Sequence, residues 1–220
     1  MSLQNVEKAR LNMIEQQIRP WNVDNSTVLE LLANVKREDF VPPAHKSLAF
    51  ADFAIPLPGG QSMLAPRLQA RLLQDAAVQP GNTVLEIGTG SGYFAALLAQ
   101  RAQRVISLEI NAELADMASA NLQQAGITNV EVRQADGSLG APAEAPFDVI
   151  VLGGSVAEVP QNLLDQLKVG GRLAAVVGES PFTCATFVTR TSATDFRTTQ
   201  PWECGAPRLQ NFAEKSTFTF

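Results

Sequence analysis

The segment VLEIGTGSGY begins at residue 84 and combines an apolar run, a carboxylate and glycines at every second position. The glycines are Gly88, Gly90 and Gly92. A P-loop needs a Lys-Ser/Thr pair after its glycines, and a GxGxxG dinucleotide fingerprint needs a glycine where Tyr93 stands. Glu86 lies two residues before the first glycine, where a carboxylate repels a pyrophosphate and attracts a cation. The segment therefore favours S-adenosylmethionine (AdoMet), whose methionyl end carries an ammonium and a sulfonium.

Two further carboxylates end the next two apolar runs. Glu109 is followed by Ile110, and Asp136 by Gly137. An acid at the first position commonly accepts hydrogen bonds from ribose hydroxyls, and one at the second could reach the adenine amine. A glycine turn alone is often only tight packing, and a lone strand-end acid is often only solvated, so the prediction depends on their combination. The predicted cofactor residues are Glu86, Gly88, Thr89, Gly90, Gly92, Glu109, Ile110, Asp136 and Gly137.

Alternating strands and helices are expected to position these residues. Apolar runs predict strands over 83–87, 104–110, 129–136, 147–154 and 171–178, and helical patterns predict helices over 92–102, 112–125 and 160–167. Such alternation implies βαβ units and a parallel sheet, which binds ligands outside the carboxyl ends of its strands. We therefore predict an α/β, Rossmann-like AdoMet-dependent methyltransferase fold, with a mostly parallel central sheet and helices on both faces.

The flanking segments have other patterns. Helices are predicted over 4–18, 24–36 (with Asp24 as N-cap) and 68–77, whereas residues 40–66 carry prolines and a Gly-Gly pair typical of ordered turns. ATFVTRT, DFRTTQPWE and KSTFTF resemble strands without intervening helices, which predicts an antiparallel C-terminal edge. We expect one domain over 1–220, with an N-terminal helical cap and substrate-side loop (1–66), an AdoMet-binding core (67–178) and a C-terminal β segment (179–220).

Composition argues against several other functions. Seventeen scattered Lys and Arg against 22 Asp and Glu give a net charge of −5, which disfavours nucleic acid as a partner. We expect a cytoplasmic protein without membrane association, because no apolar run is long enough for a span or a signal core. His45 is the only histidine, and Cys184 and Cys204 are expected to be free core thiols, so neither a metal site nor a Ser-His-Asp triad is predicted. The oligomeric state is not predicted.

The lack of an evident general base bears on the methyl acceptor. Residues 152–155 read Leu-Gly-Gly-Ser where amine methyltransferases often carry Asn/Asp-Pro-Pro-aromatic, and thiol or hydroxyl acceptors usually need a base. A carboxylate, with an unperturbed pKa of about 4, is already an ionised nucleophile at neutral pH. Proximity and orientation can then lower the barrier by roughly 7–11 kcal/mol. The pattern favours a carboxylate acceptor and direct, metal-free transfer.

Several segments resemble the protein-L-isoaspartate O-methyltransferase family over roughly residues 10–178. They are FVPPAHKSLAFAD (40–52), PLPGGQSMLAP (56–66), VLEIGTGSGY (84–93), ADG (135–137), APFDVIVLGG (145–154) and VPQNLLDQLKVGGRL (159–173). The resemblance implies an AdoMet-dependent repair enzyme that acts on isoaspartyl residues of damaged peptides and proteins. It would methylate their abnormal α-carboxylate, and the ester would then collapse to a succinimide that partly reopens as aspartate. Residues 179–220 match the family poorly.

One departure from the family pattern concerns the acceptor side. The family has Thr-Ile-Ser-x-Pro after Gly-Gln, so its catalytic-site serine falls on Leu64, while Ser62 keeps a hydroxyl at the threonine position. The resemblance implies that Gln61, Ser62, Leu64 and Arg67 are the catalytic-side residues, although Arg67 is more simply a solvated helix residue than a fork for a carboxylate.

This departure leaves two alternatives open. The chain could be an AdoMet-binding relative that methylates another carboxylate or a small molecule, or a regulatory protein without turnover. The aromatic residues of the unmatched tail could line a changed acceptor pocket, although such residues more often belong to the core. They are Phe182, Trp202 and Phe212.

Overall fold

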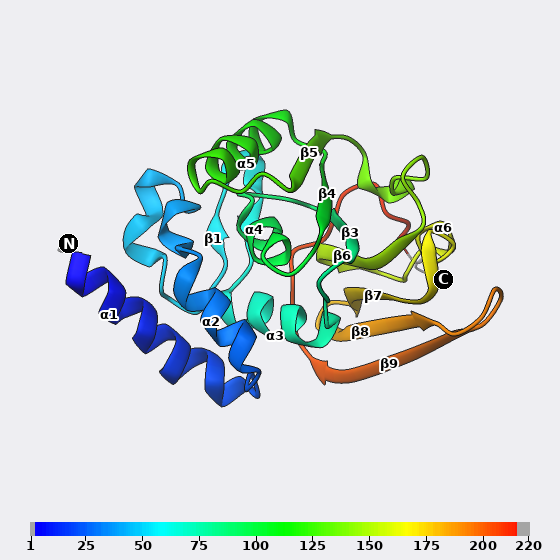
Figure 1. Ribbon diagram of the computed structural model, residues 1–220, viewed down its shortest axis with the longest axis horizontal. Helices are drawn as coiled ribbons and strands as arrows, with labels where there is room; N and C mark the ends of the chain where they lie inside the picture. Colours follow the sequence, from blue (N-terminus) through cyan, green and yellow to red (C-terminus); the bar gives the residue numbers. More distant parts are fainter. Residues whose placement is uncertain (1–2, 215–220) are drawn as a thin grey trace, which may run out of the picture.

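The computed structural model describes residues 3–214 and is built around a seven-stranded sheet (Figure 1). The strands are β3 (Thr83–Ile87), β4 (Arg104–Glu109), β5 (Val130–Gln134), β6 (Phe147–Val156), β7 (Leu167–Glu179), β8 (Phe182–Arg190) and β9 (Phe196–Glu203). Their order across the sheet is β5-β4-β3-β6-β7-β8-β9. The first five strands in this order run parallel, whereas β8 and β9 are antiparallel to their neighbours. The predicted α/β class and antiparallel edge are confirmed, but the predicted strand KSTFTF lies outside the described residues.

Successive residues of a strand point to opposite sides of the sheet. Because the central strands are nearly continuous apolar runs, both faces of the sheet are apolar. Val84, Val105 and Val149 face one side, and Leu85, Ile106 and Ile150 face the other. Helices α3 (Pro66–Ala76), α4 (Tyr93–Ala99) and α5 (Ala112–Gln124) pack on the first side, and α2 (Ser26–Asn34) packs on α3.

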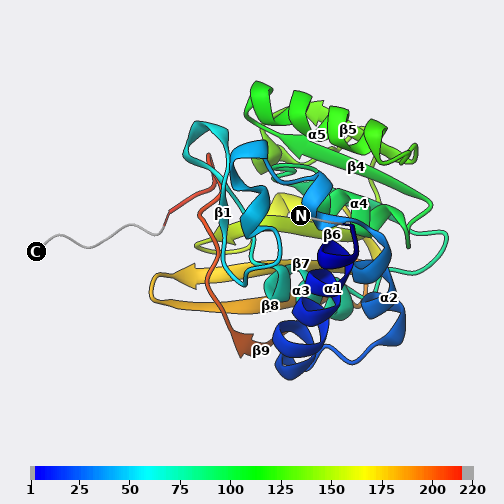
Figure 2. The same ribbon diagram turned by 90° about the vertical axis from the view of Figure 1, so that its left-hand side faces the viewer.

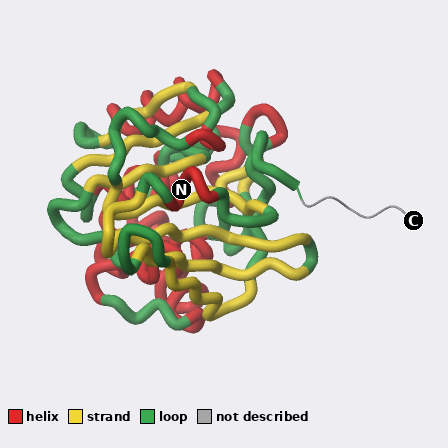
Figure 3. The backbone as a smooth tube through the Cα atoms, turned by 90° about the vertical axis from the view of Figure 1, so that its right-hand side faces the viewer, coloured by secondary structure: helices red, strands yellow, loops and turns green. Residues whose placement is uncertain are grey.

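Shorter elements cover the second side, among them α6 (Gln161–Leu164) and a 3₁₀ turn over Gly137–Leu139. The helix predicted over 160–167 is therefore too long, because Leu167 already pairs with Phe147 as the first residue of β7. The helix predicted over 92–102 likewise ends at Ala99. The β8–β9 hairpin extends from the body at the far edge of the sheet (Figure 3).

The N-terminal region packs beside α3 (Figure 2). Helix α1 (Leu3–Met13) continues through a π-helical turn (Ile14–Ile18) and a 3₁₀ turn (Arg19–Trp21). Asn25 caps α2 with its side chain, which accepts hydrogen bonds from the N–H groups of Thr27 and Val28, so the expected cap at Asp24 is wrong by one residue.

The proline-rich segment before α3 folds as turns, as predicted. Its elements are 3₁₀ turns over Arg37–Asp39, Pro43–Leu48 and Pro58–Gly60, and a short antiparallel pair, β1 (Ile55–Pro56) and β2 (Ser62–Met63).

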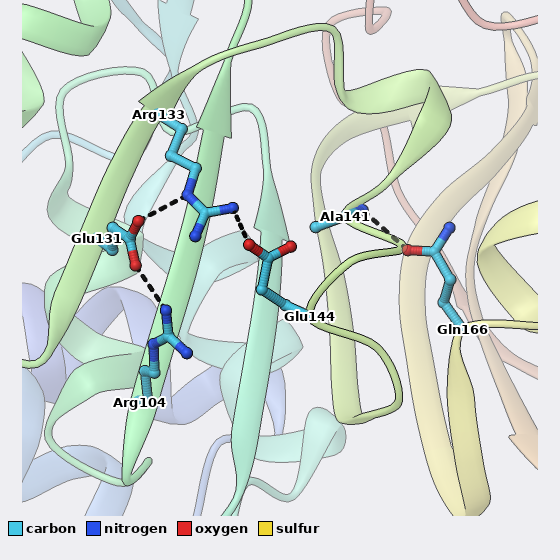
Figure 4. A network of polar contacts seen from close by, with 6 residues as sticks. All are labelled: Arg104, Glu131, Arg133, Ala141, Glu144 and Gln166. Atoms are coloured by element: carbon cyan, nitrogen blue, oxygen red, sulfur yellow. Dashed lines mark hydrogen bonds and ion pairs between the residues drawn. The ribbon is translucent and has the colours of Figure 1, made fainter.

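Ion pairs connect side chains at the β5 edge of the sheet, which is opposite the β8–β9 hairpin (Figure 4). Glu131 of β5 pairs with Arg104 of β4 at 2.6 Å and with Arg133 at 2.7 Å, and Arg133 also pairs with Glu144. These pairs are partly exposed, so each contributes little to stability on its own.

The strands that follow β3 in the sequence lie on both sides of it in the sheet. From β3 it runs through β4 to β5 on one side, and β6 then returns to the other side of β3. Strand order thus reverses between β3 and β6, and the crevice at their carboxyl ends is where sheets of this kind bind ligands.

Candidate functional site

The glycine turn after β3 meets the end of β6 at very short range. Gly88 has a φ of +88°, a conformation that side chains disfavour. A Cβ on Gly153 of β6 would lie only 2.4 Å from the carbonyl oxygen of Gly88. Glycine at both positions therefore brings the two backbones together and opens the crevice above them.

Glu109 ends β4 and holds the glycine turn. Its Oε2 accepts a hydrogen bond of 2.9 Å from the N–H of Gly90, and its Oε1 accepts one of 3.0 Å from the N–H of Asn111. A carboxylate has about four acceptor sites, so capacity remains for the hydroxyls of a ligand. The side chain is fixed in place and lines the crevice.

Glu86 lies beneath the turn and is fully buried. Its Oε2 accepts a hydrogen bond from the hydroxyl of Ser107, which also bonds to Thr89. Its Oε1 has no hydrogen-bond partner among residues 3–214. Burial, opposed by the Ser107 hydrogen bond and reinforced by the nearby Glu109, raises the pKa of Glu86 to about 8. An unsatisfied buried carboxyl oxygen is rare in folded proteins, so Glu86 needs an explanation beyond packing.

Asp136 and Gly137 follow β5, so they lie at the carboxyl ends of the strands, as the glycine turn does. A Cβ on Gly137 would lie 2.2 Å from Cγ2 of Ile87, so only glycine allows this approach. Asp136 accepts a hydrogen bond from the N–H of Ser138 and another from Asn211, at 2.9 and 2.8 Å. Burial opposes ionisation of Asp136, but these hydrogen bonds outweigh it and lower the pKa.

These groups surround a pocket whose lining combines apolar side chains with a few polar groups, as is typical of small-molecule sites. Of the predicted site residues it is lined by Gln61, Ser62, Gly88, Gly90, Glu109, Ile110 and Gly137. The other predicted cofactor residues lie around it. Glu86 lies beneath the turn, Thr89 lines an adjoining space of about 280 Å³, Gly92 caps α4 and Asp136 lies at the edge.

The segment after β9, residues 204–214, closes one side of this pocket. It pairs with the end of β6, where the N–H of Ser155 donates to Pro207 at 2.7 Å and the N–H of Leu209 donates back at 2.9 Å. The Leu209 side chain packs on the turn, because a Cβ on Gly88 would lie 2.8 Å from its Cδ2. Phe212 is buried on the second side of the sheet and lines the same pocket. Of the three tail aromatics, Phe212 therefore reaches the pocket, whereas Phe182 is 85% exposed.

The loop over 61–65 forms the opposite wall and is held from below by a buried arginine. Arg37 donates hydrogen bonds to the carbonyl oxygens of Leu64 (2.7 Å) and Ala49 (3.0 Å), and a third to Gln69. Leu64 itself is 4% exposed and lines the adjoining space with Ser62. The loop therefore brings the hydroxyl of Ser62 and the apolar side chains of Met63 and Leu64 toward the glycine turn.

Arg67 lies apart from the pocket. Its guanidinium stacks on Trp21 and its Nε pairs with Asp52 at 3.0 Å. Arg67 is a helix residue of α3 whose side chain is still 38% exposed, and these two partners hold it on a separate cleft.

Sequence reasoning missed three parts of this site. Ser107 lies in the middle of an apolar strand, and Arg37 lies in a polar stretch that resembles surface. The residues from Pro207 to Gln210 that line the pocket carry no local motif, and of this segment only Phe212 is named from the sequence. One sequence signal was available for the C-terminal segment. A Gly-Gly pair at 153–154 near the end of a buried strand indicates that another backbone approaches the strand closely there.

The described residues 3–214 hold no cluster of three or more potential metal ligands. Within the same range, no helix has both the length and the apolar character needed to cross a membrane. Cys184 and Cys204 are both free and only half-buried.

Comparison with known proteins places this geometry in context. The family described as protein-L-isoaspartate(D-aspartate) O-methyltransferase matches residues 8–203. The protein-L-isoaspartate O-methyltransferase of Koribacter versatilis is 40% identical over 195 residues, which cover 89% of this chain and 87% of the relative. Protein-L-isoaspartate O-methyltransferase 1 of Syntrophobacter fumaroxidans is 44% identical over 175 residues, or 80% and 82% of the two chains.

Solved structures share the fold. A Plasmodium falciparum protein described as a protein-L-isoaspartate O-methyltransferase, in complex with S-adenosyl-L-homocysteine, superposes with a TM-score of 0.80 at 20% identity. The match covers 91% of this chain and 98% of that one. A second protein-L-isoaspartate O-methyltransferase gives 0.78 at 25% identity over 94% of this chain and 66% of that one.

Proposed function

Because this chain belongs to the protein-L-isoaspartate O-methyltransferase family, we propose that it transfers a methyl group from AdoMet to the α-carboxylate of isoaspartyl residues in damaged peptides and proteins. One observation carries the proposal. Gln61 and Ser62 of the proline-rich loop line the same pocket as Gly88 and Glu109 of the glycine turn. Donor side and acceptor side therefore meet in one space.

The residues present fit AdoMet. Glu109 presents free acceptor sites to a ribose, and the orphaned oxygen of Glu86 suits the ammonium of the methionyl end. When bound, AdoMet would supply a methyl group made electrophilic by its sulfonium. We assign cofactor binding to the predicted set around the turn, with Thr89, Gly92 and Asp136 as supporting residues.

The acceptor side needs orientation rather than a base. An isoaspartyl carboxylate is ionised at neutral pH, so the protein has only to align its oxygen and exclude water. Ser62 offers a hydrogen bond to that carboxylate, Gln61 borders it, and the Leu64 side chain excludes water. The Arg37 hydrogen bond to the Leu64 carbonyl keeps this wall rigid.

Leu64 favours a second candidate, a relative with a changed acceptor. A leucine donates no hydrogen bond, and losing one preorganised donor costs about 3 kcal/mol in comparable sites. Such an enzyme would bind AdoMet and methylate a different carboxylate or a small molecule.

Methyl transfer from labelled AdoMet separates the two candidates. The substrates are an isoaspartyl peptide and its aspartyl counterpart, each tested with the natural chain and with Leu64→Ser. We expect turnover of the isoaspartyl peptide only, and faster turnover in Leu64→Ser. AdoMet binding without turnover of either peptide by either protein would refute the proposal and support a changed acceptor.

A further inference from the structure

Both tryptophans of the chain lie on a cleft of about 410 Å³ that is separate from the cofactor pocket. The cleft is bounded by the 3₁₀ turn that ends at Trp21, by the first two turns of α3, and by the chain that leaves β9 at Trp202. Ala65 lines it too, directly after Leu64 in the acceptor loop. The cleft is therefore next to the loop over 61–65, which forms the proposed acceptor side of the pocket.

Each tryptophan carries an arginine on its ring. The guanidinium carbon of Arg67 lies 3.8 Å from the ring centroid of Trp21, and that of Arg71 lies 4.4 Å from the ring centroid of Trp202. The two arginines are four residues apart on α3 and so share one helix face. Stacking holds both cations at the wall of the cleft.

Stacking uses the flat face of a guanidinium and leaves the N–H groups at its edge available. Arg67 spends its Nε on Asp52, whereas Arg71 forms no hydrogen bond or ion pair with any residue between 3 and 214. The cleft also meets the N-terminus of α3, where the helix dipole favours negative charge. These groups together suit carboxylates, which a guanidinium edge can bind in a bidentate manner.

The nearby acids do not cancel this preference. Asp52 is already paired with Arg67, and Asp75, which accepts a 2.8 Å hydrogen bond from Nε1 of Trp202, does not line the cleft. Glu203 borders the cleft but is exposed to solvent, where its charge is screened.

We propose that this cleft binds acidic side chains that flank the methylated residue in the acceptor polypeptide. The proposal rests on the proposed function, since it assigns the cleft to the same acceptor chain. Leu64 borders the methyl-transfer side of the loop and Ala65 borders the cleft, so an acceptor residue and its close neighbours in sequence would occupy the two spaces together. Acidic flanks would therefore lower KM and leave kcat unchanged.

Tryptophan fluorescence tests binding without any need for methyl transfer, because both tryptophans report on the cleft. The probe is a short peptide with two glutamates and no isoaspartyl residue, and its control has glutamines instead. We expect a saturable change with the acidic peptide alone, weakened at least fivefold by Arg71→Gln and by 0.5 M salt. Arg104→Gln, on the opposite edge of the sheet, should leave the titration unchanged.

Equal responses to both peptides, or none, would overturn the proposal. So would tryptophan signals that change only with protein concentration, since they would assign the cleft to a second copy of the chain. Trp202→Phe should remove the part of the signal that depends on Arg71, and circular dichroism shows whether each variant is folded.

A kinetic comparison then connects the cleft to turnover. Isoaspartyl peptides with flanking Glu should have a KM several-fold below that of peptides with flanking Gln, and Arg71→Gln should remove this difference at unchanged kcat. A KM ratio that survives Arg71→Gln would overturn the proposal. Absence of all methylation would refute the proposed function, and the fluorescence titration would still decide whether the cleft binds acidic chains.

Discussion

Asn211 donates a 2.8 Å hydrogen bond from its Nδ2 to Oδ2 of Asp136, across 75 residues of sequence. This contact joins the C-terminal segment to the end of β5, over the predicted adenine side of the pocket. The segment is also held by the backbone pair between Leu209 and Ser155, by a 3.0 Å hydrogen bond from Arg208 to the carbonyl of Gly178, and by the buried ring of Phe212. The tail that resembles the family least thus completes the proposed cofactor pocket.

Asn211→Ala should weaken AdoMet binding by roughly two- to tenfold, because an exposed hydrogen bond contributes about 0.5–1.5 kcal/mol. A small loss of stability is expected as well, because Asn211 has a φ of +63°, which alanine tolerates less well than asparagine. Calorimetric titration with S-adenosylhomocysteine measures the affinity. Gln161→Ala, which removes an equally exposed hydrogen bond to Asp165, is the control. Equal affinities of the two variants would mean that the segment does not act on the pocket.

Glu109→Ala should weaken AdoMet binding by tenfold or more in a protein that still folds. The change removes the proposed ribose acceptor and also leaves the N–H groups of Gly90 and Asn111 without partners, so the turn loosens as well. Calorimetry again gives the affinity, and a thermal melt checks the fold. Glu113→Ala removes an exposed acid four residues away and should bind AdoMet normally. Unchanged affinity in Glu109→Ala would refute the assignment.

The order of the central elements was predictable, because it depends on local signals. Apolar runs of five or six residues that end at Glu86-Ile87-Gly88 or at Glu109 identify both the strand and its carboxyl end. Errors arose where a distant partner decided the structure. The sequence pattern places Leu167 at the end of a helix, but Leu167 pairs with Phe147 and begins β7.

The acceptor side was less predictable for the same reason. Arg37 lies in a charged stretch that resembles surface, and only the fold brings the carbonyl oxygens of Leu64 and Ala49 around it. Leu209 has no periodic context, and it reaches Gly88 because the segment pairs with an irregular end of β6. Sequence patterns report what neighbours in the chain do, whereas these contacts link residues far apart.

Glu86→Gln should change how stability depends on pH. With its pKa raised from 4.5 to about 8 in the folded protein, the carboxyl binds more protons folded than unfolded between these values. The natural chain therefore loses stability as pH rises through this window, on the order of a few kcal/mol, and the loss is complete above pH 8. Glutamine cannot ionise, so the variant should gain on the natural chain as pH rises.

Urea denaturation at pH 5 and pH 8.5 without ligand measures this difference. Glu86→Gln should nevertheless bind AdoMet more weakly at pH 8, because it lacks the ionisable carboxyl that we assign to the ammonium of AdoMet. A stability difference that is the same at both pH values would show that Glu86 ionises normally.

Arg37→Met tests whether the buried guanidinium supports the acceptor loop. Its removal leaves the carbonyl oxygens of Leu64 and Ala49 and the amide oxygen of Gln69 without donors in the interior. Orphaned buried acceptors cost about 1–3 kcal/mol each, so we expect a loss of about 3 kcal/mol or more in the free energy of unfolding. Burial lowers the pKa of Arg37 only to about 10, so the guanidinium is charged at neutral pH. The loss of stability in Arg37→Met should therefore be measurable at neutral pH.

The expected effect of Arg37→Met on function is selective. AdoMet affinity should fall little in the folded fraction, because the cofactor residues lie on other elements, whereas KM for the isoaspartyl peptide should rise as the loop over 61–65 loosens. Urea denaturation gives the stability and steady-state kinetics give KM. Arg104→Gln, at the exposed edge of the sheet, should change stability by no more than about 0.5 kcal/mol. A similar small change in Arg37→Met would show that the loop holds its position without the guanidinium.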